Sequence, residues 1–262
     1  MKQLSHIQLG CGLIRIGREW GFKQATIPTE QEAQSFLEQA VTLGIRFFDT
    51  APSYGLSEER LGSFLQTLSP DVRKTLTIAT KCGEHWNMKQ NNTFVDHSYD
   101  ALVRSIDQSL SLLGNVDILQ IHKATPEVLA SEEVDKALAY AKSRGIKQLG
   151  VSISDMETAK IAATRFELSV VQLPFNQQRT SLQEALELFK EQEKFIIVNR
   201  PFNMGEMVHK DEKEKSKQQL LVEAYGFVLK EDFEGVILTG TGNPTHLKEN
   251  VEAFSNALSN LH

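Results

Sequence analysis

The chain of 262 residues carries 34 acidic and 28 basic side chains, a formal net charge of −6, and 40% of its residues are hydrophobic. This composition is ordinary for a folded protein with one substantial core, and it leaves no excess of basic side chains to neutralise the phosphates of a nucleic acid. No segment approaches the ~20 consecutive apolar residues that a membrane-spanning helix requires, so we expect neither nucleic acid nor membrane as a partner.

Short apolar runs recur along the chain, and a longer stretch with helical spacing of its apolar residues follows each one. The runs predict eight strands, at 6–10, 45–49, 76–81, 116–122, 146–152, 169–174, 195–200 and 235–240. Such alternation is typical of a parallel sheet whose strands are joined by crossover helices. Eight units in about 260 residues predict a (β/α)8 TIM barrel, with one domain covering residues 1–262.

Helix-capping patterns agree with this division. Thr29, followed by Glu32, predicts a capping box at the start of one helix, and Gly44 predicts the end of that helix. Asn243 as N-cap and Pro244 as first helical residue predict the start of the last helix. The charged run 209–217 predicts a solvated loop that leads into a helix.

A doubly wound sheet is the competing fold, but its dinucleotide-binding fingerprint is incomplete. The segment GCGLIRIG supplies Gly10 and Gly12, whereas Arg15 stands where the third glycine belongs. The barrel therefore remains the predicted fold.

Four ionisable side chains lie at or just beyond the ends of neighbouring predicted strands: Asp49, Tyr54, Lys81 and His122. The C-terminal ends of barrel strands converge on one rim, where active sites of this architecture are built. Taken singly, each residue has an ordinary structural explanation, such as loop capping, a surface lysine or a core histidine.

Together the four predict an acid–base site. An ammonium at Lys81 would lower the pKa of the Tyr54 phenol from its usual value of about 10, and Asp49 would neutralise and position Lys81. His122 could then donate a hydrogen bond to a carbonyl oxygen and help to polarise it.

Several motifs in order extend this interpretation: GIRFFDTAPSYGLSEERLG, TIATK, VDILQIH, KQLGVS, VVQLPFN and GTGNPTHLKEN. Over residues 10–254 the chain resembles the aldo-keto reductase superfamily. The resemblance implies a (β/α)8 barrel that binds an extended nicotinamide dinucleotide without a Rossmann motif. It also implies an NADPH-dependent oxidoreductase that reduces a small aldehyde or ketone, with Tyr54 as general acid, Lys81 and Asp49 tuning it, and His122 orienting the carbonyl.

The resemblance also implies cofactor-binding positions. Ser152 and Gln172 match residues that bind the nicotinamide carboxamide, and the loop after the seventh strand matches one that contacts the pyrophosphate. The matching positions are Ser152, Gln172, Arg200, Pro201, Phe202, Gly240, Thr241, Glu249 and Asn250. The last four belong to the adenosine end, where the first turn of the final helix would offer free N–H groups to a phosphate.

Some positions depart from the family pattern. Ile153 and Asn199 replace residues that many members use around the nicotinamide, and Gly240, Gly242 and His246 replace basic residues that often bind the 2′-phosphate. Because the resemblance implies a preference for NADPH, NADPH stays the expected cofactor despite these changes, and the missing basic residues make NADH the alternative. No long extension follows the last predicted helix, which suggests an open substrate site, rimmed by Trp20, Trp86 and Phe22.

Two other functions remain open at this point. Lys81 could act as a Schiff-base nucleophile of the aldolase type, or the barrel could be a binding or regulatory protein with a weakened cofactor site. A metal site is not expected, because the sequence has no HxH or HExxH pair. Two cysteines without CxxC spacing and the absence of a secretory signal predict a cytoplasmic protein, and we expect a monomer.

Overall fold

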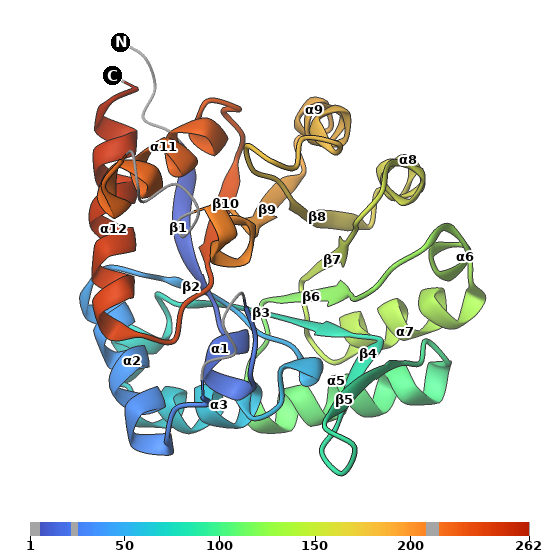
Figure 1. The fold of residues 1–262 in the computed structure, drawn as a ribbon. Helices are drawn as coiled ribbons and strands as arrows, with labels where there is room; N and C mark the ends of the chain where they lie inside the picture. The colour runs from blue at the N-terminus through green and yellow to red at the C-terminus, as the bar shows by residue number, and fades with distance from the viewer. Residues whose placement is uncertain (1–5, 22–25, 208–214, 262) are drawn as a thin grey trace.

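The computed structural model describes residues 6–21, 26–207 and 215–261, and its centre is a closed barrel of parallel strands (Figure 1). The strands follow one another around the barrel in the order β1, β2, β3, β6, β7, β8, β9, β10, and β10 closes the ring by pairing with β1. Their bounds are β1 Ile7–Gly12, β2 Phe47–Asp49, β3 Thr77–Cys82, β6 Ile118–Ile121, β7 Gln148–Ser152, β8 Leu168–Pro174, β9 Phe195–Asn199 and β10 Gly235–Thr239. The predicted (β/α)8 barrel is confirmed, and every predicted strand is present, with ends displaced by no more than two residues.

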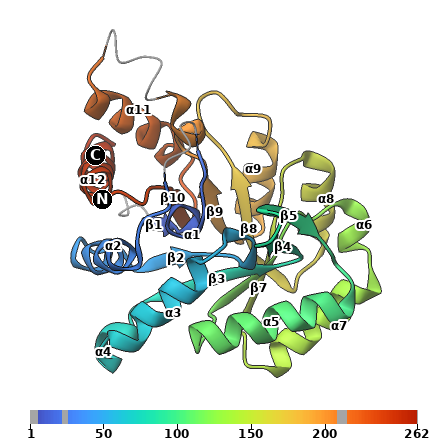
Figure 2. The same cartoon turned by 60° about the horizontal axis from the view of Figure 1, so that its bottom comes forward.

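Helices surround the barrel on its outer side (Figure 2). The α-helices are α1 Ile14–Gly17, α2 Glu30–Thr42, α3 Ser57–Thr67, α4 Pro70–Arg73, α5 Tyr99–Leu113, α6 Pro126–Leu129, α7 Glu132–Ser143, α8 Met156–Thr164, α9 Gln183–Glu191, α11 Lys217–Leu229 and α12 Pro244–Ser259, and the 3-10 turns are η1 Pro52–Tyr54 and η2 Asn203–Gly205. The predicted capping box of Thr29 and Glu32 is present. Most of the charged run 209–217 lies outside the described residues, but its end matches the prediction, because Ser216 caps α11.

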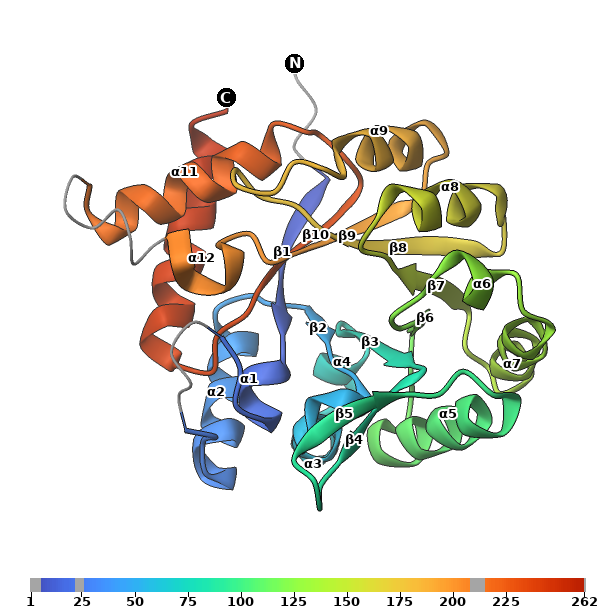
Figure 3. The same ribbon diagram turned by 45° about the vertical axis from the view of Figure 1, so that its right-hand side comes forward.

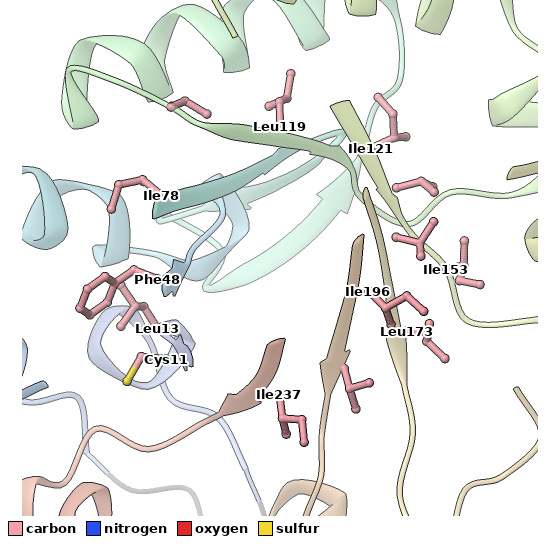
Figure 4. Packing of buried hydrophobic residues seen from close by; sticks show 14 of the residues in the cluster. Cys11, Leu13, Phe48, Ile78, Leu119, Ile121, Ile153, Leu173, Ile196 and Ile237 are labelled. Carbon is pink, nitrogen blue, oxygen red and sulfur yellow. The ribbon is translucent and has the colours of Figure 1, made fainter. Parts of the chain in front are cut away.

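Alternate residues along the strands face two separate hydrophobic clusters, as the two-residue repeat of a strand requires. On β9, Ile196 belongs to the large cluster between barrel and helices, whereas Ile197 belongs to the small cluster inside the barrel. Ile78 and Ala79 on β3 divide in the same way. Figure 4 labels members of the large cluster on several strands, Ile78, Leu119, Ile196 and Ile237 among them. The barrel interior is therefore a packed core, which leaves ligand space only at its ends.

An antiparallel hairpin that the sequence patterns did not predict interrupts the barrel connection after β3. It consists of β4 Glu84–Asn87 and β5 Asn92–Val95, and Figure 3 shows it beside the barrel between α3 and α5. Gly83 joins β3 to β4 with a φ of 105°, a conformation that side chains other than glycine's rarely permit. This turn brings β4 against η1, the short turn that carries Tyr54.

Within the described residues, no helix combines the length and the apolar character needed to cross a bilayer.

Candidate active site

A cavity of about 690 Å³ opens at the C-terminal ends of the barrel strands. The last residue of six strands lines it: Gly12, Asp49, Ser152, Pro174, Asn199 and Thr239. Among the lining side chains, six are Lys or Arg and three are Asp or Glu, although the whole chain has a net charge of −6. The cavity thus concentrates positive charge at the rim where barrel active sites are built.

A fully buried ion pair lies at the bottom of this cavity, where Asp49 lines it and Lys81 lies beneath Asp49. Lys81 Nζ lies 2.6 Å from Asp49 Oδ2 and donates a second hydrogen bond, of 3.0 Å, to the carbonyl of Thr50. The other carboxylate oxygen, Oδ1, accepts hydrogen bonds from Gln120 at 3.2 Å and Gln172 at 3.1 Å. Burial acts to lower the pKa of Lys81, but the Asp49 carboxylate and the Tyr54 phenol together outweigh it, so the pKa of Lys81 is raised and the ammonium is retained.

Tyr54 lies directly above this pair. The Lys81 ammonium is 4.8 Å from the centre of the Tyr54 ring and interacts with its phenol. The net pKa shift of Tyr54 is opposite to the one we predicted: burial raises the pKa of the phenol, and the lowering effect of Lys81 offsets only part of that rise. The phenol therefore holds its proton firmly until a reaction draws it away.

His122 packs against the Tyr54 ring edge-on, with ring centres 6.1 Å apart. Its Nδ1 lies 3.2 Å from Oε2 of Glu84, the first residue of β4, and the Glu84 side chain is almost fully buried. Burial and nearby cations hold the pKa of His122 well below its ordinary range, the cations being Lys81, Lys123 and Arg18. A neutral imidazole beside a carboxylate carries its proton on Nδ1, so Glu84 fixes the tautomer of His122.

The structure brings the other predicted site residues into the same cavity. Its wall includes Ser152, Gln172, Arg200, Pro201, Phe202, Gly240, Thr241, Glu249 and Asn250. Gln172 donates to Asp49, so a predicted cofactor-binding residue and the predicted acid–base group share one hydrogen-bond network. Among the four predicted catalytic residues, only Lys81 does not line the cavity, because it lies beneath Asp49 and Tyr54.

The start of α12 has the predicted N-cap, Asn243, and the predicted first helical residue, Pro244, but its backbone donors differ from our prediction. We expected free backbone N–H groups there, but Asn243 Oδ1 accepts hydrogen bonds from the N–H groups of Thr245 and His246. The N–H of Asn243 itself donates to Thr241 Oγ1, and Pro244 has none. The strong N-cap therefore already satisfies the donors that we had assigned to a phosphate.

Positive charge near α12 comes from Arg15 and Lys217, which line the cavity, and Lys217 lies 2.5 Å from Glu249. Lys248 on the helix itself pairs with Glu252 and does not line the cavity.

Comparison with known proteins agrees with this geometry. A sequence model of the aldo/keto reductase family matches residues 8–223. The chain belongs to this family. This aldo/keto reductase is 26% identical over 231 residues to the uncharacterized oxidoreductase YqkF of Bacillus subtilis, a match that covers 86% of this chain and 70% of YqkF.

Two other relatives are informative. One is the Schizosaccharomyces pombe aldo-keto reductase yakc, whose name specifies NADP(+); it is 28% identical over 155 residues, which are 57% of this chain and only 45% of yakc. The other is the crystal structure of PA4992, a Pseudomonas aeruginosa protein assigned to the aldo-keto reductases. It superposes with a TM-score of 0.79 at 28% identity and covers 95% of this chain and 90% of that one. The chain is therefore an oxidoreductase of the aldo-keto reductase type.

Two further residues, Glu84 on β4 and Arg18 after α1, complete the site but were not predicted as functional. Glu84 follows Lys81 by three positions and could have been noticed as a carboxylate close to a predicted strand end. Arg18 lies in the loop after β1, where nothing in its neighbourhood distinguishes it from a surface arginine. Among the described residues, no cluster of side chains suited to a metal ion is found.

Proposed function

We propose that this aldo/keto reductase reduces an aldehyde or ketone to an alcohol, with Tyr54 as the proton donor. The observation that carries the proposal is the buried pair of Asp49 and Lys81 directly beneath a phenol that lines the cavity. As the carbonyl carbon gains a hydride, its oxygen gains negative charge and takes the proton of Tyr54. The Lys81 ammonium, 4.8 Å from the ring, stabilises the phenolate that remains.

The cavity wall fits a nicotinamide dinucleotide, which supplies the hydride when bound. Its excess of basic residues suits a pyrophosphate, with Arg200 in the expected loop. Asn199 Oδ1 is buried at the wall without a hydrogen-bond donor, which suits a carboxamide N–H of the cofactor. Ser152 and Gln172 lie close to it at the ends of neighbouring strands and would orient the same group.

NADPH is the cofactor that we propose, because Arg15 and Lys217 line the cavity near α12 and because the relative yakc is named for NADP(+). Isothermal titration calorimetry should give a dissociation constant for NADPH at least about tenfold lower than for NADH, since a charge-assisted contact to the 2′-phosphate is absent with NADH. Equal affinities would contradict the NADPH preference. Failure to bind either cofactor would favour the binding-protein alternative instead.

The direct test of the reaction is consumption of NADPH by the purified protein in the presence of aldehydes, with the alcohol product identified by mass spectrometry. A Schiff-base mechanism at Lys81 makes a different prediction, namely a substrate adduct that borohydride traps on the protein. The buried, ion-paired state of Lys81 opposes that mechanism, because a nucleophilic amine must be neutral and reachable. Turnover without a trapped adduct would support the reductase, and an adduct without NADPH consumption would overturn it.

A pH prediction follows from the pairing of His122 with Glu84. If Nδ1 carries the proton of the neutral ring, Nε2 can donate to a substrate carbonyl only when the pair binds a second proton. That proton is present at low pH and is lost as pH rises, and because the pKa of His122 is held well below 6.5, the loss begins well below pH 6.5. We expect kcat/KM for reduction to fall between about pH 5 and 8, by up to tenfold per pH unit.

The variant Glu84→Gln should flatten this profile. Lys123 faces Oε1 of Glu84 at 3.8 Å and would hold the amide oxygen, which turns the amide N–H₂ towards Nδ1. Nε2 would then keep its proton in the neutral ring. Lys81, Arg18 and His97 also lower the pKa of His122, but a neutral ring that already donates from Nε2 needs no second proton. The measurement is kcat/KM against pH for both proteins, and superimposable profiles would disprove the role of Glu84.

A further inference from the structure

We propose that Arg18 binds an anionic group of the substrate, so that the preferred substrates are aldehydes or ketones that carry a carboxylate or a phosphate. The inference rests on the proposed reductase function and deepens it. Its basis is an unpaired guanidinium beside the predicted proton donor, on the same cavity wall.

A close backbone contact fixes the position of Arg18. The N–H of Leu56 donates to the carbonyl of Gly17 at 3.0 Å, which joins the loop after β1 to the turn that carries Tyr54. The approach is so close that a Cβ on Gly55 would lie 2.4 Å from the Gly17 oxygen and 3.3 Å from Cβ of Arg18. The side chain of Arg18 therefore starts next to Tyr54, and both residues line the cavity.

Two aromatic rings orient the guanidinium. Its central carbon lies 5.1 Å from the ring centre of Trp20 and 4.9 Å from that of Trp86, so both tryptophans of the chain contact it. Cation–π contacts of this kind hold the planar group while its N–H edge stays free for hydrogen bonding. A guanidinium whose orientation is already set loses less entropy when it binds an oxyanion with two parallel hydrogen bonds.

The guanidinium has no acceptor of its own. In the described part of the chain, Arg18 makes no hydrogen bond and no ion pair through its side chain, and its Nε is buried without a partner. The neighbouring carboxylate of Glu84 acts on it only at longer range, because the oxygens of Glu84 face His122 and Lys123. Burial lowers the pKa of Arg18, yet an arginine stays charged at neutral pH.

A purely structural role explains this arrangement less well. An arginine that only packed two tryptophans together would still leave a buried N–H unsatisfied, and such groups cost stability. A cofactor phosphate is the competing partner, because Arg200, at an expected phosphate position after β9, also lies over Trp20, 6.0 Å from its ring centre. Arg18 differs from Arg200 in that it adjoins the turn of Tyr54 through the contact of Gly17 with Leu56. The space beside Tyr54 and His122 is where the substrate must lie, so a substrate oxyanion is the group that the site lacks.

Matched pairs of aldehydes test the proposal. For the carboxylate, 4-formylbenzoate is compared with the neutral 4-formylbenzamide, and for the phosphate, glyceraldehyde 3-phosphate is compared with glyceraldehyde. We expect kcat/KM to be about tenfold or more higher for the anion in at least one pair, and the pair that shows it identifies the oxyanion. The amide makes the aldehyde slightly more electrophilic, so chemical reactivity alone would favour the neutral compound.

The variant Arg18→Gln should bring the anion-to-neutral ratio close to one, and Arg18→Lys should restore part of it. Lys89→Gln is the matched control, since Lys89 is exposed at the tip of the β4–β5 hairpin and the change in net charge is the same. A ratio that falls equally in the control, or that survives in Arg18→Gln, overturns the proposal. Reduction of the neutral aldehydes without preference for an anion also overturns the proposal. If none of the four aldehydes is reduced, the reductase function is refuted and this inference with it.

Discussion

Replacing Tyr54 by Phe should lower the turnover of aldehyde reduction by on the order of 10²- to 10⁴-fold and leave cofactor affinity nearly unchanged. The phenylalanine ring keeps the contacts of Tyr54 with the Lys81 ammonium and with the edge of His122, so the cavity should retain its shape. Only the hydroxyl that delivers the proton is lost. Steady-state kinetics give the turnover, and calorimetric titration with NADPH gives the affinity.

Tyr140→Phe is the control for this experiment. The hydroxyl of Tyr140 also donates a partly buried hydrogen bond, to Asp107 at 2.8 Å. Tyr140, however, lies on α7 and does not line the cavity. We expect it to keep normal turnover. If Tyr54→Phe also kept normal turnover, Tyr54 would not be the proton donor.

Replacing Lys81 by Met should reduce turnover by at least about 10²-fold and destabilise the fold by about 3–5 kcal/mol. Both effects have one cause, the loss of the ammonium that neutralises Asp49 and stabilises the phenolate of Tyr54. Asp49 would remain as a buried carboxylate, held only by the amides of Gln120 and Gln172. Chemical denaturation measures the stability, and single-turnover kinetics measure the chemical step.

A second substitution separates the two effects. In Lys81→Met combined with Asp49→Asn the buried charge is gone, so stability should largely return while turnover stays low. Lys194→Met is a matched control, because Lys194 is also buried but donates to the carbonyls of Arg165 and Leu168 away from the cavity. Recovery of turnover in the double variant would show that Lys81 acts on folding and not on the reaction.

Much of the fold could be predicted because the barrel strands are short apolar runs with turn residues at both ends. Asp49 and Lys81 end or nearly end such runs, so the closure of the barrel alone brings them together. The β4–β5 hairpin could not be predicted in this way. Its strands are short, polar and partly exposed, so they lack the alternation of apolar and polar residues that marks a half-buried strand.

The electrostatic details were harder to predict than the positions. The sequence indicated that Lys81 would lie beside Tyr54, but the pKa of the phenol depends on how deeply the pair is buried, and burial outweighs the ammonium. The partner of His122 depended on the turn at Gly83, which aims Glu84 at the imidazole. Arg18 reaches the site through a backbone contact between Gly17 and Leu56, and such a contact leaves no periodic pattern in the sequence.

The clamp around Arg18 has a consequence for optical work on this protein. Trp20 and Trp86 are the only indoles in the chain: Trp20 lines the cavity, and Trp86 contacts Arg18, which also lines it, whereas the buried core of the described residues contains no indole. Intrinsic fluorescence excited selectively through indole therefore reports on the cavity near Arg18 alone, and its quenching will follow ligands that enter there. Circular dichroism of the backbone follows the barrel itself, so coincident unfolding curves from the two methods would show that the rim and the barrel unfold together.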